Sequence, residues 1–171
     1  LVIKDAELTS PNQIALFGNT TIENTIISNI ANKGYTPTNF RNQTGTLNMK
    51  DVTFNYDGTG NTTFGSEIGF GGTNNFENVT IIATNPVTIA TLQQVNGIFT
   101  NCIFRSATVN GVGFQATQGS QITIDGGNYT YDGTTTNVND IQAGGDGTIV
   151  RLRNNPIGGT RTYNNGIITT N

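Results

Sequence analysis

The chain has 171 residues, of which 11% are charged and 34% are hydrophobic, and its formal net charge is −3. Its Lys and Arg side chains are scattered singly, which argues against a nucleic-acid partner, and no apolar run is long enough to insert into a membrane. The chain has no histidine and a single cysteine, Cys102, so an internal disulfide is excluded and a transition-metal site is not expected. We therefore predict one domain that needs no cofactor and no metal.

A six-residue phrase begins in the first predicted strand and recurs along the chain. It reads as a large apolar residue, a usually charged one, then Asn, Asp or Gly, a mostly small residue, a variable one and a second apolar residue. A period of about 20–50 residues is the sequence signature of an architecture built by stacking. The copies lie at 3–8, 22–27, 49–54, 76–81 and 99–104, with weaker copies at 124–129 and 152–157.

The third position of the phrase predicts a tight corner in the backbone. Asn, Asp and Gly are the residue types that enter the left-handed region at least cost. Two short strands that meet at such a corner would point positions one, four and six inward and positions two and five outward. The third positions are Asp5, Asn24, Asp51, Asn78, Asn101, Gly126 and Asn154.

Between the copies, the chain alternates further strands with turn-rich loops. Apolar runs predict additional strands at 14–17, 67–70, 87–89 and 112–114, and a last short strand at 167–168. Segments 29–41 and 133–139 are predicted to be loops. The strand at 1–8 would leave an open edge, and the chain starts at Leu1 rather than Met, so we expect a fragment or a processed part of a longer chain.

A corner that recurs about every 25 residues predicts a coil that closes and stacks on the next one, with neighbouring strands about 4.8 Å apart. The phrase resembles the coils of the right-handed parallel β-helix superfold, of the pectate-lyase and phage-tailspike type. We therefore predict an all-β chain that forms a right-handed parallel β-helix, a solenoid of about six to seven coils, over residues 1–171. An antiparallel β-sandwich is the alternative, but it gives no reason to repeat one phrase in one phase.

The second positions predict an outward ladder of charges. Strands about 4.8 Å apart would bring opposite charges next to each other, and we predict that Lys50 satisfies both Glu23 and Glu77. This order leaves no close pair of carboxylates of the kind that glycoside hydrolysis needs. The second positions are Lys4, Glu23, Lys50, Glu77, Thr100, Asp125 and Arg153.

Aromatic and acidic residues in loops are the candidate ligand-binding residues. Tyrosine rings there could form platforms for sugar stacking, with ordinary surface packing as the alternative. The candidates are Tyr35, Tyr56, Asp57, Tyr131 and Asp132. Asp followed by Gly is first a turn signal. Enzymes of the pectate-lyase type use Asp clusters with calcium and a catalytic Arg or Lys; this sequence shows no Asp cluster, so we predict no catalytic residue and no metal ligand.

The resemblance implies an extracellular or virion-borne protein with a structural and attachment role, similar to a phage tail fibre or tailspike. Such proteins are commonly homotrimers, so we expect a homo-oligomer, with a trimer favoured, or a repeating assembly, and a cell-surface polysaccharide as a ligand. One alternative is a fragment of a polysaccharide lyase or hydrolase. Another is a bacterial surface adhesin or filament subunit.

Overall fold

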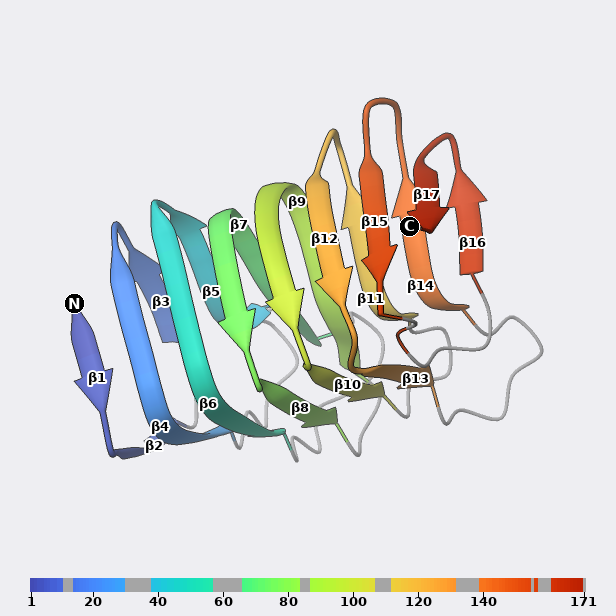
Figure 1. Cartoon of the computed structure of the whole chain (residues 1–171). Helices are drawn as coiled ribbons and strands as arrows, with labels where there is room; N and C mark the ends of the chain where they lie inside the picture. Colours follow the sequence, from blue (N-terminus) through green and yellow to red (C-terminus); the bar gives the residue numbers. More distant parts are fainter. Residues whose placement is uncertain are drawn as a thin grey trace.

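A computed structural model describes residues 1–10, 14–29, 38–56, 66–83, 87–106, 112–131, 139–154, 156 and 161–170. Over these ranges the chain forms strands and no helix, and all the strands join one strongly curled 17-stranded sheet (Figure 1). The strands are β1 (Val2–Lys4), β2 (Glu7–Ser10), β3 (Ile14–Phe17), β4 (Thr20–Asn29), β5 (Thr38–Thr44), β6 (Thr46–Tyr56), β7 (Ser66–Glu77), β8 (Thr80–Ala83), β9 (Val87–Thr100), β10 (Ile103–Ser106), β11 (Val112–Thr117), β12 (Gln121–Asp125), β13 (Asn128–Tyr131), β14 (Asn139–Gly144), β15 (Ile149–Arg153), β16 (Arg161–Asn164) and β17 (Ile167–Thr170). Among the described residues, no helix could cross a membrane.

The strands of one repeat pair in parallel with the equivalent strands of the next repeat. One series runs β1–β4–β6–β7–β9–β12–β15–β17. After the corner, a second series runs β2–β4–β6–β8–β10–β13. A third runs β3–β5–β7–β9–β11–β14–β16. This parallel stacking confirms the predicted all-β, parallel architecture, is compatible with a solenoid, and contradicts the antiparallel sandwich.

The predicted corners are present at all seven third positions, from Asp5 to Asn154. Each has a positive φ, between 47° at Asn24 and 64° at Gly126. The backbone N–H of the corner residue donates to the carbonyl oxygen of the second position in the next repeat. These bonds measure 3.0 Å from Asn78 to Thr100, 2.9 Å from Asn101 to Asp125 and 2.9 Å from Gly126 to Arg153. The corner therefore turns the chain and joins two repeats at once.

The inward positions of the phrase build the core, as the sequence predicted. Phe54, Ile81, Phe104 and Tyr129 occupy one register position in β6, β8, β10 and β13, and all four are buried. The rings of Phe104 and Tyr129 meet edge to face with centroids 5.4 Å apart. Phe99 links this stack to the strands before the corner, with its centroid 6.0 Å from that of Phe104. The fourth-position residues Thr25, Val52, Val79 and Cys102 are also buried.

A second bend, which the sequence analysis did not predict, lies six residues before the corner, between strands at Gly18 and Gly45 and inside β7 at Gly72. Gly18, Gly45 and Gly72 have φ values of 74°, 90° and 71°. A Cβ atom on Gly45 would lie 2.5 Å from the carbonyl carbon of Gly18, and a Cβ atom on Gly72 would clash with the carbonyl oxygen of Gly45. Glycine is therefore required here both by backbone conformation and by close approach of successive repeats.

Candidate interaction surface

The outer side of the strands that precede the corner carries two parallel rows of side chains. The charged row consists of the first four second-position residues, which are register partners on β1, β4, β6 and β7. Its members are Lys4, Glu23, Lys50 and Glu77. The neighbouring row lies two residues earlier on β4, β6, β7 and β9, and its members are Thr21, Asn48, Asn75 and Ile98. We call the two rows together the polar face.

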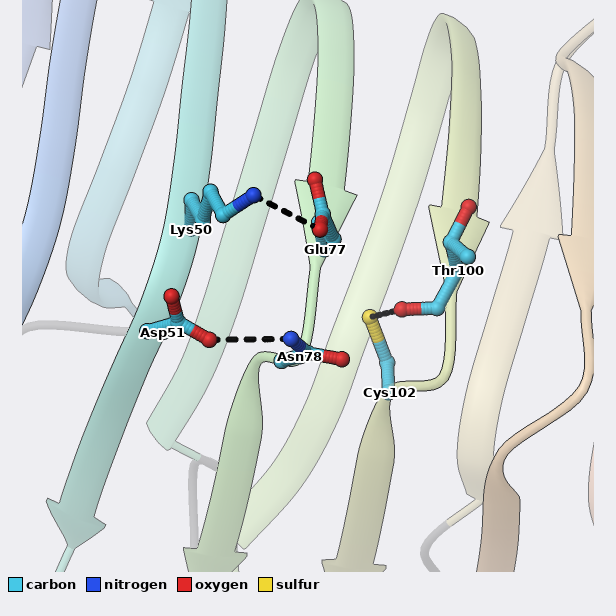
Figure 2. Close-up of polar contacts among 6 residues, drawn as sticks. All are labelled: Lys50, Asp51, Glu77, Asn78, Thr100 and Cys102. Atoms are coloured by element: carbon cyan, nitrogen blue, oxygen red, sulfur yellow. Dashed lines mark hydrogen bonds and ion pairs between the residues drawn. The ribbon is translucent and has the colours of Figure 1, made fainter.

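Two ion pairs hold the charged row. Lys4 Nζ lies 2.7 Å from Glu23 Oε2, and Lys50 Nζ lies 2.8 Å from Glu77 Oε1. Figure 2 shows the second pair bridging β6 and β7. The hydrogen bond to Glu23, and then the negative charge of Glu23, raise the pKa of Lys4; Glu77 raises the pKa of Lys50 in the same way. We predicted that Lys50 pairs with both Glu23 and Glu77. This prediction is wrong for Glu23, which forms its ion pair with Lys4.

The four charged side chains stay about half exposed, with relative accessibilities of 50% and 34% in the first pair and 52% and 49% in the second. An ammonium group has three N–H donors and a carboxylate has four lone-pair positions. Each member can therefore keep its partner within the chain and still bind a further group from outside.

Side-chain amides reinforce the stacking next to the charges. At the corners, Asn24 Nδ2 donates to Asp5 Oδ1 over 3.1 Å, and Asn78 Nδ2 donates to Asp51 Oδ1 over 2.9 Å (Figure 2). The corner residue of the previous repeat, Gly126, has no side chain that could accept a hydrogen bond. Asn154 Nδ2 therefore donates to Oδ1 of the neighbouring Asp125. These bonds fix the spacing of the outward residues along the stack.

In the neighbouring row, Asn75 Nδ2 donates to Asn48 Oδ1 over 3.0 Å. The amide nitrogen of Asn48 and the amide oxygen of Asn75 take no part in this bond. Within the described part of the chain, these two atoms have no hydrogen-bonding partner. The row thus presents both a donor and an acceptor to an incoming molecule.

An open depression of about 380 Å³ lies between the two rows, over β4, β6, β7 and β9. Its lining is Thr21, Glu23, Asn48, Met49, Lys50, Asn75, Phe76, Glu77, Ile98 and Thr100. Met49 and Phe76 are buried, so a ligand would meet the outward residues, which are polar except for the half-exposed Ile98. Sequence reasoning missed this depression, although the alternation of polar residues at 21, 23, 48, 50, 75 and 77 was a signal for it.

A lysine separates the two carboxylates of the polar face. Glu23 and Glu77 lie two strands apart, and Lys50 stands between them as the register partner of both. In the described ranges, no group of three His, Cys, Asp or Glu residues is placed to hold a metal ion.

The buried thiol and phenol belong to the core. Cys102 is fully buried, and its Sγ lies 3.5 Å from the carbonyl oxygen of Thr100 (Figure 2). Burial raises the pKa of Cys102 to about 12 and raises the pKa of Tyr129 well above its ordinary value. Cys102 is therefore a small core residue, as the sequence predicted.

The predicted ligand-binding residues fall at the margins of the described structure. Tyr35, Asp57 and Asp132 lie outside the described residues. Tyr56 ends β6 and Tyr131 ends β13, and only their backbone is described. They share one register position along the sheet, because Tyr56 pairs with Ala83 of β8, Ala83 with Ser106 of β10, and Ser106 with Tyr131. Three strand spacings, about 14 Å, thus separate the two residues.

Comparisons of the chain with protein-family models, with curated proteins and with solved structures gave no match. A functional assignment for this chain therefore depends on its own geometry.

Proposed function

We propose that this chain is a structural and attachment module, extracellular or virion-borne, of the kind found in phage tail fibres and tailspikes, and that it binds surface glycans. We also propose that the curled sheet is a right-handed parallel β-helix of six to seven coils. The observation that carries the proposal is the continuous parallel pairing through seven equivalent corners. A stack of this kind forms a stiff body on which outward residues repeat at a fixed distance.

Stiffness and the nature of the polar face favour attachment over catalysis. Backbone bonds at the corners and side-chain amide bonds join successive repeats, so the outward groups are held before any ligand arrives. A ligand that contacts several repeats then gains from groups that are already in place. The half-exposed Lys and Glu residues and the amides suit a polar partner.

The shared register of Tyr56 and Tyr131 supports the glycan part of the proposal. Aromatic rings bury large area at low entropic cost, and their hydroxyl groups offer a hydrogen bond. The backbones at these two positions lie about 14 Å apart on one line of the stack, a spacing at which two residues could contact separate sugars of one chain. Tyr35, Asp57 and Asp132 are the further residues that the sequence assigns to this ligand site.

A panel of cell-surface polysaccharides, measured by titration calorimetry, tests the proposal. We expect binding of at least one polysaccharide, with affinity at least tenfold lower in Tyr56→Ala and in Tyr131→Ala. Tyr56→Phe is the matched control, because it keeps the ring and should keep most of the affinity. The same samples are assayed for new reducing ends and unsaturated products. Turnover would overturn the attachment role in favour of a lyase or hydrolase, and absence of any binding would overturn the glycan ligand.

A further inference from the structure

We propose that the charged row pairs face to face with the charged row of a second copy of this chain, about a two-fold axis that runs parallel to the strands in the plane of the interface and passes midway between Glu23 and Lys50. The inference rests on the proposed structural role and adds to it the surface and the partner.

The order of charges carries the inference. The four members of the charged row alternate plus, minus, plus, minus on adjacent strands. A two-fold axis at the centre of the row reverses this order in the second copy. Lys4 then faces the partner's Glu77, and Glu23 faces the partner's Lys50, and both contacts occur twice because the interface is isologous. All four positions meet an opposite charge.

The spacing of the charges selects the same partner. Neighbouring charges in the row lie on neighbouring strands, about 4.8 Å apart. A second copy carries the same spacing, so the four contacts lie in register with one another. A polyanion such as nucleic acid would meet Lys4 and Lys50 but would be repelled by Glu23 and Glu77. The alternation of sign therefore favours a partner that alternates in the same way.

The exposed fraction of the charged side chains leaves room for this contact. Lys4 and Glu77, at the two ends of the row, have half of their side-chain surface open, as does Lys50. The adjacent depression gives the long side chains of a partner space beside the row. The ion pairs within each copy need not break, because each group has donors or lone pairs to spare.

Symmetry separates this pair from the trimer that the sequence favours. Only a two-fold axis places a surface against itself, whereas a three-fold axis places two different surfaces against each other. A stable interface usually buries about 800 Å² per partner, and a contact a few strands wide is smaller. We therefore expect a weak pair that is sensitive to ionic strength.

Sedimentation velocity over a concentration series is the test. We expect the mass to rise from 18.2 kDa toward twice that value, 36.4 kDa, at low ionic strength, and to return to 18.2 kDa in about 1 M salt, where the Debye length falls to roughly 3 Å. A single species of 18.2 kDa at every concentration in low salt would overturn the inference, and so would a limiting mass three times 18.2 kDa.

Two charge-exchange variants make the test specific. In the double variant Lys50→Glu, Glu77→Lys, the pair between β6 and β7 persists and the net charge stays −3. The row then reads plus, minus, minus, plus, so the two-fold axis brings like charges together. We expect self-association at least tenfold weaker than in the unchanged chain. Equal association would contradict the assigned face.

In the quadruple variant Lys4→Glu, Glu23→Lys, Lys50→Glu, Glu77→Lys, the row reads minus, plus, minus, plus and complements itself again. We expect pairing to return to the level of the unchanged chain, which also shows that loss in the double variant is not a folding defect. Mixed pairs of the quadruple variant with the unchanged chain should not form, because like charges would meet. Failure of the quadruple variant to pair would overturn the inference.

The glycan titration described above separates the two proposals. A monomer that still binds polysaccharide overturns the pairing and leaves the attachment role. A salt-sensitive pair that binds no polysaccharide supports the pairing and overturns the glycan ligand.

Discussion

Replacing Ile81 by Ala tests the stacked core directly. Ile81 has no exposed surface, and its register partners are Phe54 in the preceding repeat and Phe104 in the following one. The change removes three carbon atoms, worth about 0.8 kcal/mol each or about 2.4 kcal/mol together. Strand pairing on both sides limits collapse of the neighbours, so the cavity adds to this loss. We expect the free energy of unfolding to fall by about 3–5 kcal/mol.

The matched control for this prediction is Ile103→Ala. Ile103 is the residue before Phe104 and has the same side chain as Ile81, but it points outward and is 41% exposed. We expect it to cost less than about 1 kcal/mol, because little buried surface is lost. Urea unfolding followed by circular dichroism gives both values from the shift in midpoint at constant slope. A cost below about 1 kcal/mol for Ile81→Ala, or equal costs for the two variants, would refute the inward stack.

Four further predictions concern the corners and the buried thiol. Gly127 has a φ of 90°, and a Cβ atom there would clash with the carbonyl oxygen of Cys102, so Gly127→Ala should lower the unfolding free energy by at least about 2 kcal/mol in urea titrations. Asn101 has a φ of 51°, so Asn101→Ala should cost about 1 kcal/mol while Asn101→Gly costs clearly less; equal costs would argue against a conformational role. Burial raises the pKa of Cys102 from 9.0 to about 12, so the native thiol should not react with a disulfide reagent at pH 8 until the chain is unfolded. The folded chain then keeps a proton that the unfolded chain loses, so stability should fall as pH rises from 9 to 12, and Cys102→Ser should remove that part of the slope seen in pH-dependent melting.

The corners were predictable because their cause is local. Asn24, Asn78 and Asn101 are residue types that enter the left-handed region cheaply, and the apolar positions around them fix which sides face inward. The glycine bend has a different cause. Gly45 is needed because the backbone of Gly18 approaches it from the previous repeat, and no sequence pattern reveals such an approach before the strands are stacked.

The candidate surface was predictable only in part. The order of charges followed from the phrase, because equivalent positions meet on adjacent strands. The ion-pair partner of Glu23 could not be predicted in this way, because Glu23 lies one strand from Lys4 and one strand from Lys50. The geometry of the side chains determines that Glu23 pairs with Lys4. The depression also depends on the joint placement of two rows, which a linear pattern does not display.

The direction of the hydrogen bonds has a mechanical consequence. Bonds such as those from Asn78 to Thr100 and from Asn101 to Asp125 join repeats along the stacking direction. Tension applied along that direction loads the repeats one after another, so the chain should peel open one repeat at a time at low force. Tension applied along the strands shears a whole row of bonds together and meets much higher resistance. The module should therefore bear the highest load when the force acts along the strands, perpendicular to the stacking direction.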